Sequence, residues 1–379
     1  MHSPSPHKRN KMYYYWIDVV GTCNLRCPTC AVGNFKPSEF SGDVNPTGLM
    51  QIEMYRQIIQ KIKADDISER NEIHLYNWGE PLLHPKIDEI VSITKQAGYY
   101  CGLSSNLNKV KNLESVIKMN PDFFRISLSG FTQKNYEKTH RRGNIEVVKE
   151  NMETLRSYIN KYNATTEVQV LYHVYKHNAD DDLLKMAEYC KNIGFNLQPV
   201  WAYFMPVEKG IQLQKDCVSE DDARVIEMLA IDPRKTAEIS APFIEQDCNL
   251  RKNQTVINFD GSVQLCCGTY DRVHAIAPAF IEIPHDELQE KKYRAPICIP
   301  CMEGGLHVGL TYGAAESLDK IGNKALRENG SELIFNQMSE PHLKHTDQLG
   351  KVTVVELLKP RVRKQNRGLR KFFNILKKK

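Results

Sequence analysis

Three cysteines near the N-terminus, Cys23, Cys27 and Cys30, have a spacing that suits metal chemistry. Three thiolates on one short loop can hold three irons of a cubane [4Fe–4S] cluster and leave the fourth iron without a protein ligand. A structural zinc site is the alternative, but zinc usually takes four closing ligands, and this loop does not supply them. We therefore expect an iron–sulfur cluster with one open iron on this loop.

A second run of cysteines lies towards the C-terminus: Cys248, Cys266, Cys267, Cys298 and Cys301. The chain has 11 cysteines in all, an odd number, and no apolar signal segment at its N-terminus. These features favour a reducing, cytoplasmic setting in which cysteines serve metal or redox chemistry rather than disulfides. The three that stand alone, Cys101, Cys190 and Cys217, are expected to be small buried hydrophobes.

Short β-rich runs alternate with amphipathic segments between residues 13 and 205. Strands are expected at residues 13–20, 72–77, 99–104, 123–128, 166–174 and 195–201. Helices are expected at residues 51–64, 85–97, 112–119, 145–162 and 180–192. Six such units predict an α/β fold with a parallel sheet and right-handed crossovers.

The unusual loops of this region follow the first four expected strands. In parallel α/β folds the chemistry lies at the C-terminal ends of the strands, so these loops should assemble one site. The loop at residues 139–143 could also face a substrate, but a solvated charge cluster is the more ordinary interpretation. We identify no general acid or base from the sequence.

Two of these loops carry a family resemblance. Residues 23–30, with their three cysteines, and residues 77–85, Asn-Trp-Gly-Glu-Pro-Leu-Leu-His-Pro, resemble the radical S-adenosylmethionine (SAM) superfamily. The resemblance implies a partial (β/α)6 barrel over residues 13–205. It also implies that SAM chelates the open iron, and that an electron from the reduced cluster cleaves SAM to methionine and a 5′-deoxyadenosyl radical. A reducing donor such as flavodoxin or ferredoxin is implied as a partner.

The resemblance further implies which residues contact SAM. The loop after the second strand corresponds to a Gly-Gly-Glu-type motif that binds the SAM amino group, with Trp in place of the first Gly. The serines that end the fourth strand resemble a ribose-contacting position, and the pair after the third strand is a weaker case. Ordinary turn and strand-end roles remain the alternatives. The implied contacts are Trp78, Gly79, Glu80, Ser105, Asn106, Ser127 and Ser129.

The C-terminal cysteines resemble the SPASM/twitch auxiliary-cluster domains that accompany many radical SAM enzymes. The signature is Cys248, twelve residues, Gly261, four residues and Cys266, followed by Cys298 and Cys301. Four thiolates complete one [4Fe–4S] cluster. A four-cysteine zinc ribbon is the alternative. The spacing from the glycine favours Cys266 over Cys267 as the ligand.

The expected organisation has four parts. A radical SAM core at 13–205 is followed by a bridging segment at 206–240, with a helix near 220–230. An auxiliary-cluster domain at 241–310 follows, with a hairpin over 255–265 that turns at Asp260 and Gly261. A polar extension at 311–379 contains one helix near 314–327.

The C-terminal tail accounts for the positive charge of the chain. The net charge is +5, yet residues 359–379 hold ten basic and no acidic residues, so the rest is mildly acidic. Residues 368–379 have the pattern of an amphipathic helix attracted to an anionic membrane surface, with a solubilising tail as the alternative. Nothing resembles a nucleic-acid-reading module, so a nucleic-acid partner is not expected.

The favoured function is therefore a radical SAM enzyme that abstracts hydrogen from its substrate. About a dozen residues precede the first strand, too few for the peptide-recognition domain of many peptide maturases. With the basic tail, this favours oxidation or rearrangement of a sugar or glycan precursor. A peptide or protein maturase and a non-catalytic metal-stabilised scaffold are the alternatives.

Overall fold

The computed structural model describes residues 11–32, 47–311, 313–335, 342–346 and 352–356. Its centre is a nine-stranded sheet with the order β6-β5-β4-β3-β2-β1-β7-β8-β9. The first six strands are parallel and stand in sequence order: β1 (Tyr13–Ile17), β2 (Asn71–His74), β3 (Tyr100–Ser105), β4 (Phe123–Leu128), β5 (Glu167–Val174) and β6 (Asn196–Trp201). The expected six-unit parallel α/β fold is confirmed.

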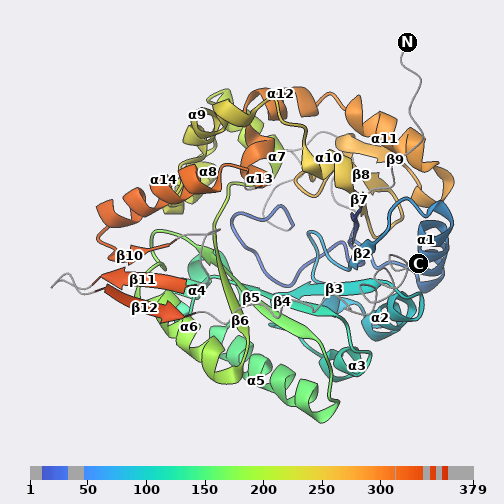
Figure 1. Cartoon of the computed structure of the whole chain (residues 1–379), viewed down its shortest axis with the longest axis horizontal. Coiled ribbons are helices and arrows are strands. Elements are labelled where there is room, and N and C mark those ends of the chain that lie inside the picture. The colour runs from blue at the N-terminus through green and yellow to red at the C-terminus, as the bar shows by residue number, and fades with distance from the viewer. Residues whose placement is uncertain (1–10, 33–46, 312, 336–341, 347–351, 357–379) are drawn as a thin grey trace, which may run out of the picture.

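Helices connect these strands and cover the outside of the curved sheet (Figure 1). They are α1 (Ile52–Asp65), α2 (Ile87–Gln96), α3 (Leu113–Lys118), α4 (Gln133–Thr139), α5 (Ile145–Lys161) and α6 (Asp181–Ile193). In α5 the buried residues recur every three or four positions, which is the spacing of one helical face packed on a core. Helix α4 is the one member of this set that the sequence did not predict.

Strand β5 shows which residues of the sheet face the outer helices and which face inward. Its residues alternate strictly between partly exposed and buried. The buried Tyr172 donates its hydroxyl proton to Asp182 of α6 at 3.1 Å, so this face packs on the outer helices. The neighbouring His173 therefore points to the inner face of the curved sheet, where a site can form.

The cysteine-rich segment continues the same sheet. Strand β7 (Gln254–Ile257) pairs in parallel with β1, and β8 (Val263–Gln264) and β9 (Ala275–Ala277) follow as antiparallel strands. The predicted hairpin joins β7 to β8, and Gly261 adopts a φ of 83° in its turn, a conformation that favours glycine. The sheet thus places this segment beside the first strand of the barrel.

Most later helices lie across the sheet from α3 and α5, at the top of Figure 1. They are α7 (Val207–Gln214), α8 (Glu220–Met228), α9 (Thr236–Ser240), α10 (Asn249–Asn253), α11 (His285–Tyr293), α12 (Cys298–Glu303), α13 (Leu306–Leu310) and α14 (Ala315–Glu328). The indole of Trp201 donates to Asp319 at 2.8 Å and so ties β6 to α14. Helices α8 and α14 match the sequence prediction; the others in this set were not predicted.

A second sheet lies near the C-terminus, at the left of Figure 1. It is antiparallel and consists of β10 (Leu333–Ile334), β11 (His342–Thr346) and β12 (Val352–Glu356). The sequence analysis expected only a polar extension here. The predicted tail helix at 368–379 lies outside the described residues. Within the described part of the chain, no helix combines the length and apolar character that crossing a bilayer requires.

Candidate active site and second cysteine site

The loops after the parallel strands surround one cavity of about 450 Å³, called here the main cavity. Its wall includes most of the side chains that the sequence analysis singled out: Cys23, Cys27, Cys30, Trp78, Gly79, Glu80, Ser105, Asn106 and Ser127. Ser129 is not in this wall. It is fully buried behind it, where its hydroxyl bonds to Nδ1 of His140 at 2.9 Å.

The three N-terminal cysteines, called here the cysteine loop, follow β1 and are held by backbone bonds. The amide of Cys30 donates to the carbonyl of Cys27 at 3.0 Å, and the amide of Leu25 donates to Sγ of Cys23 at 3.4 Å. Burial raises the pKa of Cys23 to about 12 and that of Cys30 to about 11, because desolvation disfavours the thiolate. The loop therefore needs a bound cation to hold its sulfurs as thiolates.

The loop after β2 is held in place by the buried carboxylate of Asp18, the residue that directly follows β1. Asp18 accepts hydrogen bonds from the amides of Trp78 and Gly79, each at 3.1 Å. A Cβ at Gly79 would collide with the carbonyl oxygen of Val20, so only glycine allows this approach of the two loops. The cysteine loop and the loop after β2 are thus locked together.

Glu80 joins the loops after β2 and β3. Its carboxylate accepts from the amide of Asn106 at 2.8 Å and from that of Leu82 at 3.1 Å. It is only 3% exposed, and burial raises its pKa to about 7. A buried carboxylate at a cavity wall is a partner for a ligand cation such as an ammonium group.

Asn106 connects this carboxylate to the cysteine loop. Its side-chain amide donates to Sγ of Cys23 at 3.5 Å and to the side-chain oxygen of Asn24 at 3.1 Å. The Ser105 hydroxyl accepts from the amide of Leu107 at 2.9 Å, a local turn contact, and the Ser105 side chain also hydrogen-bonds to Glu80. Asn106 therefore orients the cysteine loop, and Ser105 shapes the turn and helps to hold Glu80.

A family comparison decides the class of this site. Residues 17–190 match the family model described as the radical SAM superfamily. This part of the chain is a radical SAM domain. The cysteine loop, Glu80 and Asn106 all fall within it. Members of this superfamily bind SAM at a [4Fe–4S] cluster, as the sequence resemblance implied.

Two curated relatives align with parts of the chain. The tungsten-containing aldehyde ferredoxin oxidoreductase cofactor-modifying protein of Pyrococcus furiosus is 27% identical over 95 residues, 25% of this chain and 24% of that protein. The GTP 3′,8-cyclase of Chlorobaculum tepidum is 25% identical over 145 residues, 38% of this chain and 40% of that protein. The chain thus spans well under half the length of the curated relatives it matches.

Among solved structures, the chain is similar to Streptococcus suis SuiB bound to its precursor peptide SuiA. The two share 11% sequence identity with a TM-score of 0.49, over 79% of this chain and 68% of SuiB.

Two histidines that the sequence analysis did not single out line the main cavity of the radical SAM domain. His140, the residue after α4, and His173 of β5 both belong to its wall. Burial lowers the pKa of His140 to about 3 and that of His173 to about 4, so both imidazoles are neutral at pH 7. The expectation of a solvated charge cluster at residues 139–143 is wrong for His140, which is only 7% exposed.

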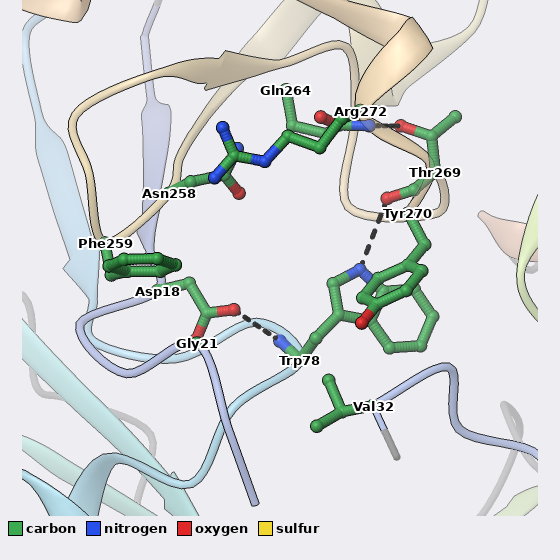
Figure 2. A pocket seen from close by; sticks show the side chains of 10 residues that line it. All are labelled: Asp18, Gly21, Val32, Trp78, Asn258, Phe259, Gln264, Thr269, Tyr270 and Arg272. Atoms are coloured by element: carbon green, nitrogen blue, oxygen red, sulfur yellow. Dashed lines mark hydrogen bonds between the residues drawn. The ribbon is translucent and has the colours of Figure 1, made fainter. Parts of the chain in front are cut away.

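Trp78, which replaces the first glycine of the family motif, contacts the cysteine-rich segment. Its indole nitrogen donates to the carbonyl of Thr269 at 3.2 Å, and its ring meets Tyr270 edge-on at 5.5 Å (Figure 2). Figure 2 also shows Asp18 bonded to the Trp78 amide beside a small pocket that Arg272 borders. The loop after β2 is therefore anchored on the C-terminal part of the sheet.

Four C-terminal cysteines border a separate, small cavity of about 30 Å³. We call Cys248, Cys266, Cys298 and Cys301 the second cysteine group. Most of the remaining wall is apolar, with Leu250, Leu265, Ile297 and Met302 among its side chains. Burial and, to a smaller extent, the nearby Cys248 and Cys298 thiolates raise the pKa of Cys301 to about 12.

The adjacent residue Cys267 lies elsewhere. It lines the main cavity and not the small one.

The three isolated cysteines differ in burial. Cys101 and Cys190 are buried, as expected. Cys217 is exposed, so the expectation of a buried side chain is wrong for this residue.

Neither cysteine set has the geometry of a single-metal site. Among the residues that the structure describes, no three His, Cys, Asp or Glu side chains converge on one ion position. A tetrahedral zinc site needs such convergence, whereas each thiolate of a cubane binds its own iron.

Proposed function

We propose that this chain is a radical SAM enzyme that cleaves SAM reductively and abstracts a hydrogen atom from its substrate. The observation that carries this proposal is the convergence of the cysteine loop, Glu80 and Asn106 on the main cavity. When loaded, the cluster supplies an electron to SAM, which yields methionine and a 5′-deoxyadenosyl radical.

We assign Cys23, Cys27 and Cys30 as the ligands of this cluster. Three thiolates leave one iron open for the amino and carboxylate groups of SAM. Asn106, through its contact with Cys23, orients the loop that carries these ligands.

Glu80 is the proposed hydrogen-bond acceptor for the amino group of SAM. Its two backbone hydrogen bonds fix the carboxylate before SAM arrives, so little reorganisation is needed. The N–H donors of that amino group would stabilise the ionised carboxylate, whose burial otherwise raises the pKa of Glu80 to about 7. Gly79, Trp78 and Ser127 complete the proposed SAM contacts in the cavity wall. Ser129 acts through His140 rather than by direct contact.

The second cysteine group is the proposed ligand set of an auxiliary [4Fe–4S] cluster. Its four thiols border one small, largely apolar cavity, which suits a cluster with no open iron. We retain residues 13–205 and 241–310 as the two functional units, joined by 206–240. Because β7 pairs with β1, the two units share one sheet.

A sugar or glycan precursor is the proposed substrate class, and its oxidation or rearrangement the proposed reaction. The support is the pair of neutral imidazoles in the wall of the main cavity, those of His140 and His173, because a neutral ring nitrogen can donate to or accept from a hydroxyl group of such a substrate.

The test is SAM cleavage by the anaerobically reconstituted protein reduced with dithionite, or with flavodoxin or ferredoxin as donor. Formation of 5′-deoxyadenosine, measured by liquid chromatography and mass spectrometry, is expected in the wild type. Cys27→Ala should abolish it. Cys217→Ala, an exposed cysteine outside both sites, serves as the matched control and should cleave SAM normally. Cleavage retained by Cys27→Ala would sink the proposal.

A further inference from the structure

Basic side chains lie on and beside the cysteine loop. Arg26 belongs to the loop itself, between Cys23 and Cys27, and is half-buried. Its amide donates to the carbonyl of Arg141 at 3.0 Å, so the segment after α4 lies against the loop. Arg141 and the next residue, Arg142, are both exposed. The cysteine loop therefore has positively charged neighbours on the surface of the protein.

The loop after β3 adds another cation to this surface. The side-chain oxygen of Asn108 accepts from the amide of Asn144 at 2.8 Å, which joins this loop to the segment after α4. Lys109 directly follows Asn108 and is exposed, and Arg142 lies two residues before Asn144. The contact thus brings Lys109 into the neighbourhood of Arg142. We call Arg26, Lys109, Arg141 and Arg142 the basic patch.

The basic patch has no counter-charges of its own. Among the described residues, none of its side chains forms an ion pair with a carboxylate, and Arg26 donates instead to two backbone carbonyls of its own loop, at 3.1 and 3.4 Å. Cations on the neighbouring outer helices are paired, as Lys149 is with Glu146 at 2.9 Å and Lys185 with Asp181 at 3.5 Å. The positive charge of the patch is therefore left for a partner.

The patch also contrasts with the chain as a whole. The net charge is +5, and the ten basic residues of 359–379 account for more than all of it, because 5 − 10 = −5. The mildly acidic remainder repels an acidic protein, whereas the patch attracts it and orients its approach. Burial raises the pKa of Cys27 and the charge of Arg141 lowers it, so the field of the patch reaches the cysteine loop.

We propose that the basic patch is the docking surface for an acidic one-electron carrier protein that reduces the cluster on the cysteine loop. This inference rests on the proposed function, which needs an electron from outside the chain. One electron leaves the carrier, which is oxidised, and enters the cluster, which is reduced, and no atom is transferred. Because electron transfer slows steeply with distance, the carrier must bind close to the cysteine loop, where the patch lies.

The first test measures binding without turnover. Lys109→Glu and Arg142→Glu are combined, while Arg26 and Arg141 stay unchanged because they contact the cysteine loop. Calorimetric titration of the reconstituted protein with oxidised flavodoxin at low salt should show about tenfold weaker binding than in the wild type. The neutral pair Lys109→Gln and Arg142→Gln should give an intermediate loss. At about 1 M ionic strength, where the Debye length is about 3 Å, the differences should disappear.

A matched control reverses two exposed charges elsewhere. Lys63→Glu and Lys235→Glu change the net charge by the same amount as the double variant of the patch. Lys63 lies on α1 and Lys235 directly precedes α9, and both helices lie far from α4 in Figure 1. This control should bind flavodoxin within about twofold of the wild type, because only charges near the contact act strongly.

The second test compares two reductants of SAM cleavage. With reduced flavodoxin at a limiting concentration, the Lys109→Glu/Arg142→Glu variant should form 5′-deoxyadenosine about tenfold more slowly than the wild type. With dithionite, a small ion that needs no protein docking surface, the two should be equally fast. The Lys63→Glu/Lys235→Glu control should match the wild type with both reductants. Iron content, measured on each sample, should be the same throughout.

The outcomes separate the inference from the function it rests on. If the wild type forms no 5′-deoxyadenosine even with dithionite, the proposed function fails, and the binding test still decides the role of the patch. Equal flavodoxin binding by the patch variant and the control would overturn the docking surface alone. An equal loss of cleavage with both reductants would also overturn it, because the side chains would then act on SAM cleavage itself. Unchanged flavodoxin binding with weaker binding to anionic phospholipid vesicles would assign the patch to a membrane surface instead.

Discussion

The cysteine loop and the second cysteine group differ mainly in what surrounds their thiols. Three thiols of the cysteine loop face a cavity of about 450 Å³ whose wall carries Glu80, Asn106 and two histidines. Four thiols of the second group border about 30 Å³ with largely apolar neighbours. An open iron needs space and polar partners for a ligand, whereas a fully ligated cluster needs neither. In the proposed function, the first region carries the chemistry and the second supplies electron transfer or structural support.

The largest effect on SAM cleavage is expected when the cysteine loop is disrupted. Cys27→Ala should abolish SAM cleavage and remove about half of the iron, because a cluster with two remaining thiolates does not assemble stably. Iron and acid-labile sulfide assays on the reconstituted protein measure the loss of iron. Full iron content in this variant would mean that the loop is not a cluster site.

Disrupting the second cysteine group should affect the iron content more than SAM cleavage. Cys298→Ala should remove about four irons per chain and leave SAM cleavage measurable, because Cys298 contacts the small cavity and not the main one. Iron content and 5′-deoxyadenosine formation are measured on the same sample. Loss of both together would show that the two sites do not act separately.

A moderate effect is expected from Glu80→Gln, which keeps the shape of the side chain and removes its charge. A hydrogen bond to a charged group contributes about 1.5–3 kcal/mol, so SAM should bind about 10- to 100-fold more weakly. Equilibrium binding of SAM to reconstituted protein measures this change. Glu89→Gln, which changes an exposed ion pair on α2, is the control and should bind SAM as the wild type does.

The same carboxylate predicts a pH dependence. Burial raises the pKa of Glu80 to about 7, so the free carboxyl group is protonated below that pH and must lose its proton before it can accept the amino N–H groups of SAM. SAM affinity should therefore rise as the pH increases from 6 to 8 in the wild type and stay flat in Glu80→Gln. Equal pH dependence in both proteins would assign the effect to another group.

The smallest effect is expected at the link between the two regions. Trp78→Phe removes the hydrogen bond to Thr269 and keeps an aromatic ring against Tyr270. A neutral hydrogen bond contributes about 0.5–1.5 kcal/mol, so the urea midpoint of unfolding should fall slightly while cleavage persists. An unchanged midpoint would mean that the link does not contribute to stability.

The elements of the barrel were predictable because local pattern and fold agree there. Each of the six strands was predicted near its observed position, since β-rich runs alternate with amphipathic helices. The cysteine loop and the loop after β2 could be identified because each sequence motif directly follows a predicted strand. The short helix α4, the helix α12 around Cys298 and the sheet β10–β12 have no comparable periodicity and were missed.

The contents of the site were less predictable because they depend on contacts distant in sequence. His140 and His173 line the same cavity although the first follows α4 and the second lies on β5. Adjacent cysteines at the end of β8 serve different cavities, which spacing cannot reveal. The pairing of β7 with β1 places the second cysteine group beside the barrel, and no local signal in either strand indicates that pairing.

The central claim is that the two regions hold clusters of different openness. Electron paramagnetic resonance of dithionite-reduced protein, with and without SAM, tests it most directly in the two single-site variants. In Cys298→Ala, where only the cysteine loop is loaded, we expect SAM to change the signal because it binds the open iron. In Cys27→Ala the remaining signal should be unaffected by SAM. A SAM-dependent change in Cys27→Ala, or none in Cys298→Ala, would contradict the account.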